Sequence, residues 1–132
     1  MSRIIWIDKH QTLTIHERQL SEHGGGGGIR DEGLLESALA RAQNLLAYSE
    51  EPPALSQLAA AYAFGIARNH PFVDGNKRTA LVVALTFLLV NGLRVTASKE
   101  DRYFVFYDLA AGNFSEDGLA QWFEANTEPV SS

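Results

Sequence analysis

Residues 70–90 read HPFVDGNKRTALVVALTFLLV, and this stretch decides how the chain folds. The proline in second place disfavours helical geometry at His70, and Gly75 can adopt the positive φ that a tight loop needs before a helix begins. The apolar run that follows is too long for an ordinary strand and stops at an Asn-Gly pair, as a helix does. The stretch therefore predicts a loop over residues 70–75 that leads into a buried helix over residues 76–90.

The start of this predicted helix carries an unusual charge. Free backbone N–H groups and the positive end of the helix dipole favour acidic residues in the first turn, whereas this sequence has Lys77 and Arg78 there. Local violations of such a rule tend to occur at functional sites. A bound polyphosphate would resolve the conflict, because the N–H groups, the ammonium and the guanidinium would all converge on one anion.

Two other residues of the loop add chemistry to this anion site. Asp74 would repel a bare phosphate, but a Mg²⁺ ion held by one carboxylate and by phosphate oxygens would join the two. His70, at the other end of the loop, is a candidate general base. Each residue taken singly has an ordinary explanation as a turn residue or a surface charge. Their combination on one short loop favours a functional site.

Residues 70–78, HPFVDGNKR, resemble the Fic family signature HPFx[D/E]GNxR. They are most similar to the death-on-curing (Doc) branch, which has Lys where most Fic proteins have Gly, and the similarity extends roughly from Thr12 to Phe123. The resemblance implies an all-α fold, a compact single-domain Fic-like helical bundle around a buried central helix, over residues 1–132. It also implies nucleotide-dependent transfer to a protein hydroxyl, with Mg²⁺ as cofactor and ATP as co-substrate.

The resemblance assigns a role to each matching position. His70 is the base, Phe72 packs beneath the loop, and Asp74 holds Mg²⁺ and so shares in catalysis. Arg68 matches an arginine of Doc proteins, although an arginine near a helix end is also often a solvated charge. The expected phosphate-binding residues are Arg68, Gly75, Asn76, Lys77 and Arg78.

Five successive glycines separate the first two predicted helices, and they are too flexible to hold structure alone. One interpretation is a mobile loop. The other is the flap with which Fic proteins pair with a target segment by strand addition, although so many glycines argue against an ordered hairpin. The expected flap residues are Gly24, Gly25, Gly26, Gly27, Gly28, Ile29 and Arg30.

The resemblance leaves the transferred group open between phosphate and AMP. Doc toxins phosphorylate elongation factor Tu, whereas Fic proteins typically transfer AMP. Lys77 fills space that Gly leaves for the α and β phosphates, which favours a reversed nucleotide and phosphate transfer. The first hypothesis is therefore a toxin of a toxin–antitoxin pair that phosphorylates a translation factor similar to elongation factor Tu. The alternatives are AMP transfer to a protein hydroxyl, or a non-catalytic nucleotide-binding interaction module. A P-loop NTPase is not indicated, because the chain has no Gly-Lys dipeptide.

The control of such a toxin can also be predicted. Many Fic proteins inhibit themselves with a helix of pattern [S/T]xxxE[G/N], and residues 96–101, TASKED, match it only in part. We therefore expect inhibition in trans, by a small antitoxin similar to the Phd partner of Doc.

The rest of the chain reads as further helices around this stretch. His16 lies on an apolar helix face and is expected to be a satisfied core histidine. Gly65, in the middle of a helix, is expected to allow close approach of the helix over residues 76–90. Helices are predicted over residues 9–23, 32–48, 56–69, 99–111 and 116–126, a short edge strand over residues 4–7, an extended connection over residues 93–97, and a frayed tail over residues 127–132.

Composition is consistent with one domain in the cytoplasm. The 132 residues are 45% hydrophobic, which is enough for a single core. A net charge of −5 provides no broad basic surface for nucleic acid. There is no cysteine, so disulfides and thiolate metal sites are excluded. No signal peptide or apolar run of membrane-spanning length is present, so we expect a cytoplasmic protein without a membrane partner.

Overall fold

The computed structural model describes residues 3–130, which form six helices and one two-stranded sheet. The predicted all-α fold is confirmed, and the predicted helices agree with the structure to within one or two residues. In chain order the elements are α1 (Lys9–His23), α2 (Glu32–Tyr48), α3 (Leu55–Asn69), α4 (Asn76–Val90), β1 (Leu93–Val95), α5 (Lys99–Ala110), α6 (Glu116–Ala125) and β2 (Thr127–Pro129).

Short polar side chains fix the starts of four helices. The Asp8 carboxylate accepts a hydrogen bond from the Gln11 N–H at 2.8 Å, and the Gln11 side chain accepts one from the Asp8 N–H at 2.9 Å. Asp31, Ser98 and Ser115 cap α2, α5 and α6 in the same way, each accepting from an N–H three residues on. Such caps contribute about 1 kcal/mol each, because they satisfy N–H groups that the helix leaves free.

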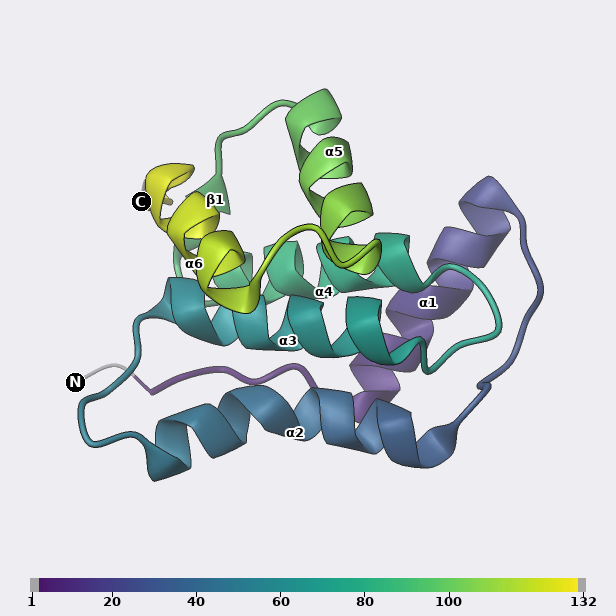
Figure 1. Ribbon diagram of the computed structural model, residues 1–132, viewed down its shortest axis with the longest axis horizontal. Coiled ribbons are helices and arrows are strands. Elements are labelled where there is room, and N and C mark those ends of the chain that lie inside the picture. Colours follow the sequence, from purple (N-terminus) through teal and green to yellow (C-terminus); the bar gives the residue numbers. More distant parts are fainter. Residues whose placement is uncertain (1–2, 131–132) are drawn as a thin grey trace.

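The helix at the centre of the bundle is α3. It lies between α2 and α4, and it also contacts α5 and α6 (Figure 1). Ten of its fifteen residues are buried, and five of these are alanines, which let neighbouring helices approach. Gly65 marks one such approach, but the neighbour there is α2 and not α4. An added Cβ would lie 2.8 Å from the Arg41 side chain and 3.0 Å from the Ala38 backbone.

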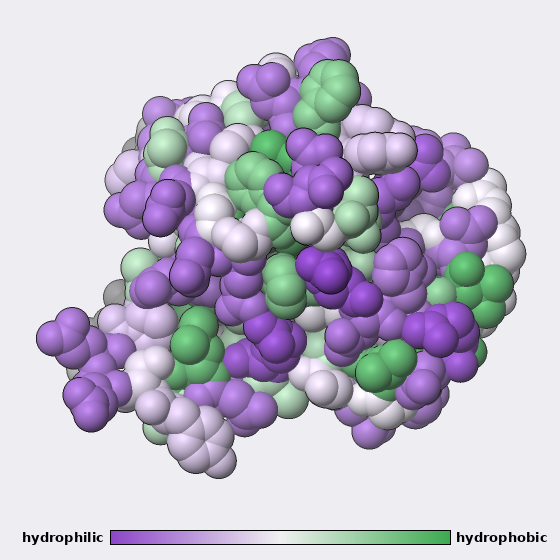
Figure 2. All heavy atoms as spheres, in the orientation of Figure 1, coloured by the Kyte–Doolittle hydropathy of each residue, from purple (hydrophilic) through white to green (hydrophobic). Residues whose placement is uncertain are grey.

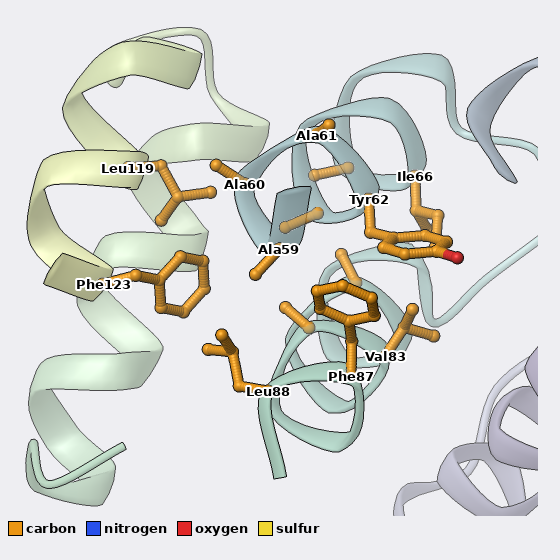
Figure 3. Close-up of a cluster of buried hydrophobic side chains, with 14 of the residues drawn as sticks. Ala59, Ala60, Ala61, Tyr62, Ile66, Val83, Phe87, Leu88, Leu119 and Phe123 are labelled. Atoms are coloured by element: carbon orange, nitrogen blue, oxygen red, sulfur yellow. The ribbon is translucent and has the colours of Figure 1, made fainter. Parts of the chain in front are cut away.

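Large side chains from α4 and α6 fill the space beside these alanines. Figure 3 shows Phe87 and Leu88 of α4 together with Leu119 and Phe123 of α6, all directed toward α3. Each of the four is fully buried. The opposite face of α4 is partly exposed, and Leu89 near the end of the helix is 55% exposed. The predicted helix over residues 76–90 is thus buried along one face only, and α3 is the enclosed element.

The C-terminal segment is a strand where a frayed tail was predicted. Residues 127–129 form β2, which pairs antiparallel with β1 in the register Leu93 to Pro129, Arg94 to Glu128 and Val95 to Thr127. The facing side chains of Arg94 and Glu128 form an ion pair. The prediction was wrong because this pairing joins segments more than thirty positions apart, so no local pattern announces it. The last two positions of the predicted tail, 131–132, lie outside the described residues.

Residues 4–7 are extended but form no strand, so the predicted edge strand is also wrong. Side chains satisfy their backbone groups instead. Asn91 accepts from the Ile5 N–H and donates to the Ile5 carbonyl, both at 2.9 Å. The Tyr62 hydroxyl accepts from the Ile7 N–H at 3.1 Å and donates to the Ile7 carbonyl at 3.2 Å. These two bridges attach the N-terminal segment to α4 and α3.

The buried bridge made by Tyr62 gives a prediction for stability. Tyr62→Phe should lower the free energy of unfolding by about 1–3 kcal/mol, since it leaves the Ile7 backbone groups unpaired in the core. Burial raises the pKa of Tyr62 above its ordinary value of 10.0. The unfolded chain therefore ionises first, and stability should fall as pH rises above about 10. Urea unfolding between pH 7 and 11 checks both points, and a Tyr62→Phe protein with an unchanged alkaline profile would contradict them.

On the face seen in Figure 2, hydrophobic residues stand in small groups among hydrophilic ones. Within residues 3–130, the helices are all too short or too polar to cross a bilayer.

Candidate nucleotide-phosphate site

The loop between α3 and α4 begins with a strained backbone. His70, which follows α3, has φ 49° and ψ 57°, and it is the only non-glycine residue with positive φ among residues 3–130. Such a conformation costs about 1–3 kcal/mol and persists where surrounding contacts enforce it. Arg30 supplies two of these contacts, since its guanidinium donates to the His70 carbonyl at 2.6 Å and to the Asn69 carbonyl at 2.8 Å. The predicted loop is confirmed, and the His70 side chain is left exposed.

Asn76, the first residue of α4, closes the loop on itself. Its Oδ1 accepts from the Phe72 N–H and its Nδ2 donates to the Phe72 carbonyl, both at 3.0 Å. The Asn76 side chain is buried, and this bidentate contact occupies both ends of its amide. Asn76 therefore shapes the loop, and its backbone N–H and the second hydrogen of Nδ2 are its remaining donors toward a phosphate within residues 3–130.

This contact predicts a large effect on the loop. Asn76→Ala should lower the free energy of unfolding by about 2–4 kcal/mol, because it leaves a buried N–H and a buried carbonyl of Phe72 without partners. Thermal unfolding measures the loss. As a control, Asn69→Ala removes a neighbouring amide that makes, within residues 3–130, one long hydrogen bond of 3.4 Å to the Leu34 carbonyl. Equal stability of the two variants would contradict the role assigned to Asn76.

The stacked rings of Phe72 and His16 support the loop from beneath. Phe72 is 1% exposed, as predicted, and its ring is stacked on His16 with 3.7 Å between centroids and 9° between planes. The His16 Nε2 lies 2.8 Å from the Asp74 carbonyl, and because that oxygen can only accept, Nε2 carries the proton. The prediction of a satisfied core histidine is confirmed. The sequence did not reveal that its partner is the loop, so His16 was missed as the residue that positions Asp74.

The glycine-rich segment lies against this loop. Ile29 and Phe72 form an antiparallel bridge, the Gly28 carbonyl accepts from the Val73 N–H at 3.1 Å, and the Arg30 N–H donates to the Pro71 carbonyl at 2.7 Å. Residues 24–28 form no hairpin. The flap expected at residues 24–30 is therefore a single extended segment whose last residues already pair with the loop. Arg30, placed in that flap from sequence, instead uses its side chain to fix the end of α3.

One glycine of this segment touches the predicted metal ligand. A Cβ at Gly25 would lie 2.8 Å from the Asp74 carboxylate, and Gly25 has φ 126°, which side-chain-bearing residues rarely adopt. The segment's backbone thus passes directly over Asp74. Any larger residue at position 25 would displace either the segment or the carboxylate.

The start of α4 is an uncapped helix end and a candidate anion site. Gly75 (φ 78°) precedes the helix, no side chain of residues 3–130 caps it, and its first turn contains no acidic residue. Lys77 and Arg78 lie in this first turn, and neither forms an ion pair within residues 3–130. The N–H groups of residues 76–78 and two cations therefore remain available to one anion.

These groups line a cavity of about 470 Å³. His70 and residues 73–78 form one wall. The other wall consists of Tyr103, Tyr107 and Ala110 of α5 and of Ala111, which follows the helix. Arg68 is not among the lining residues. Its guanidinium lies over the Phe64 ring, 5.4 Å from the centroid, and near Gly112 beyond the end of α5. The structure thus brings every predicted phosphate ligand except Arg68 to one cavity.

The side chains near the start of α4 suit a metal ion that is shared with a bound phosphate, rather than one held by protein ligands alone. Within residues 3–130 there is no group of three or more His, Cys, Asp or Glu side chains that could hold a metal. Asp74 is a lone carboxylate beside the N–H groups of residues 76–78 and the side chains of Lys77 and Arg78, which together form the candidate phosphate cradle. Mg²⁺ is commonly held by one or two carboxylates together with phosphate oxygens and waters. Asp74 is therefore the residue that would hold Mg²⁺, with the nucleotide completing the coordination.

The helical bundle, with a candidate anion site at the start of a core helix, indicates the class of this protein, and sequence comparisons identify the family. The model of the Fic/DOC family matches residues 6–88. The protein kinase doc of Escherichia phage P1 is 40% identical over 94 residues, which cover 71% of this chain and 74% of that protein. The toxin Doc of Mycolicibacterium smegmatis is 47% identical over 92 residues, which cover 70% and 68%. This chain belongs to the Fic/Doc family, in its Doc branch.

Proposed function

We propose that this protein is the toxin of a toxin–antitoxin pair and that it transfers the γ-phosphate of ATP to a hydroxyl of a target protein. The observation that carries the proposal is the convergence of His70, Asp74 and the uncapped, cationic start of α4 on one cavity. Two relatives named as a protein kinase and a toxin support the same class of function. The proposed target is a translation factor similar to elongation factor Tu, which would place the protein in the cytoplasm.

The residues of the cavity have the chemistry that this transfer needs. His70 accepts the proton of the target hydroxyl as its oxygen forms a bond to the γ-phosphorus. The bond from that phosphorus to the β–γ bridging oxygen breaks, and ADP leaves with the electron pair. Arg78, Lys77 and the N–H groups of residues 76–78 stabilise the charge on the transferring phosphoryl group.

Asp74 is suited to hold Mg²⁺ against this cradle. The ion, when bound, neutralises charge on the phosphate oxygens. Two contacts hold the aspartate in place. Its carbonyl accepts from His16, and its Oδ1 accepts from the Gly75 N–H at 2.8 Å, which leaves Oδ2 without a hydrogen bond in residues 3–130.

AMP transfer to a protein hydroxyl is the alternative within the same family. It would use the same base and cradle but would place the α-phosphorus beside His70. Lys77 favours phosphate transfer, because a half-buried ammonium side chain takes room that glycine would leave beside the helix start. A non-catalytic nucleotide-binding module is disfavoured, since such a module has no use for an exposed histidine beside the cradle.

Labelled ATP distinguishes these three functions. The purified protein is incubated with a cell lysate and with ATP labelled at either the α or the γ phosphate. We expect label in a protein band from γ-labelled ATP only. Label from the α position would indicate AMP transfer, and label from neither would favour the non-catalytic module.

Inhibition by a separate antitoxin similar to Phd is the proposed form of control. Arg78 has no carboxylate partner within residues 3–130, and the partial inhibitory pattern at residues 96–101 lies outside the lining of the cavity. Expression of the chain alone should therefore arrest growth and translation, whereas His70→Ala should be tolerated. Normal growth of cells that accumulate the unaltered, active protein would contradict this proposal.

A further inference from the structure

His70 ends α3 in a conformation that glycine usually supplies. Many helices end on a left-handed residue whose N–H binds the carbonyl four positions back. His70 takes this place here, with φ 49° and its N–H 3.3 Å from the Ile66 carbonyl. The next residue is Pro71, which has no N–H, so the further hydrogen bond that completes the common Schellman ending cannot form. The left-handed backbone of His70 therefore needs support from outside the helix.

Arg30 provides this support from the segment that joins α1 to α2, which passes the end of α3 (Figure 1). Its Nε donates to the His70 carbonyl at 2.6 Å, and its Nη2 donates to the Asn69 carbonyl at 2.8 Å. Both carbonyls lie at the helix C-terminus, where the negative end of the dipole favours a cation. The Arg30 N–H also donates to the Pro71 carbonyl at 2.7 Å. Arg30 thus holds three successive carbonyls of the chain around the candidate base.

We infer that Arg30 is a positioning residue for the transfer reaction and acts through His70, an inference that rests on the proposed function. The φ and ψ of residue 70 set the direction of its Cα–Cβ bond, and so where the imidazole lies in the cavity. Without the two side-chain hydrogen bonds, residue 70 would relax toward the backbone conformations that L residues prefer, and the base would be displaced. Arg30 itself does not line the cavity, which separates its role from that of Lys77 and Arg78.

The test compares Arg30→Ala and Arg30→Lys with the control Arg18→Ala. Arg18 is an exposed arginine of α1 whose ion pair within residues 3–130 is with Glu22, and it does not line the cavity. Lysine keeps the charge of Arg30, but its ammonium lacks the planar fork that reaches two carbonyls at once. For each protein, label transfer from γ-labelled ATP to the modified protein of a lysate is measured over a range of ATP concentrations. Thermal unfolding checks that each variant is folded.

We expect Arg30→Ala to lower the rate at saturating ATP by about 10²-fold, the effect of displacing a catalytic group by about 1 Å, with an unchanged KM for ATP. Arg30→Lys should also fall well below the unaltered protein, whereas Arg18→Ala should equal it. Added methylguanidinium should restore part of the rate of Arg30→Ala. If Arg30→Ala does not fold, Arg30→Lys serves for the same comparisons.

A second set of variants carries His70→Asn and shows whether Arg30 acts through the base. In that protein the imidazole is already absent, so Arg30→Ala or Arg30→Lys should lower the residual rate no further. An equal loss with and without His70, a raised KM for ATP at an unchanged saturating rate, or full activity of Arg30→Lys would overturn the inference and leave the proposed function standing. Absence of transfer by the unaltered protein would overturn both together.

Discussion

Replacing His70 with Asn is expected to lower the rate of phosphate transfer by about 10²- to 10⁴-fold, the usual contribution of a general base, while ATP binds as before. Asparagine is the informative choice because residue 70 has a left-handed backbone, which Asn tolerates better than most residues. The loop contacts made by the His70 carbonyl and by Arg30 involve the backbone of residue 70 and should survive. The loss would then report on the imidazole alone.

A comparison with His70→Ala separates the loss of the imidazole from the effect of backbone strain at residue 70. Alanine removes the same imidazole but fits the left-handed conformation less well, so it should unfold at a lower temperature than His70→Asn and be equally inactive. The measurements are kcat and KM for ATP together with thermal unfolding. A folded His70→Asn protein with nearly full kcat would show that another group accepts the proton.

Replacing Asp74 with Asn should lower turnover by about 10²-fold or more, because a bound Mg²⁺ supplies several kcal/mol of transition-state stabilisation. Asn retains an oxygen that can accept from the Gly75 N–H, and the backbone carbonyl remains for His16, so the loop should keep its shape. What is lost is the negative charge beside the cradle. The residual activity should no longer depend on Mg²⁺.

A Mg²⁺ titration of activity tests this role. Asp117→Asn is the control, since Asp117 is an exposed carboxylate on α6 that does not line the cavity. It should keep both the activity and the Mg²⁺ response of the unaltered protein. An Asp74→Asn protein with a normal Mg²⁺ dependence would place the metal on another residue.

The sequence was informative wherever the signal is local. The loop at residues 70–75 follows from Pro71 and Gly75, and the ends of the helices follow from caps such as Asp31 and Ser115, because each acts within three or four residues along the chain. The uncapped, cationic start of α4 could be predicted for the same reason. Cations in the first turn of a helix are a local contradiction that is visible without a structure.

What the sequence could not supply are contacts between distant segments. Nothing near His16 indicates that it stacks on Phe72, and nothing near Arg30 indicates that it binds the end of α3. The pairing of β2 with β1 is likewise set by tertiary proximity. Asn76 illustrates a further limit, since the motif identifies the residue as important but not that its amide is used inside the loop.

We propose that this protein transfers a phosphoryl group from ATP to a protein hydroxyl. The most direct test is the intact mass of the protein that becomes modified when the purified chain and ATP are added to a lysate. We expect an increase equal to one phosphoryl group, present with the unaltered chain and absent with His70→Asn. An increase equal to one adenylyl group, or no increase with the folded, unaltered chain, would contradict it.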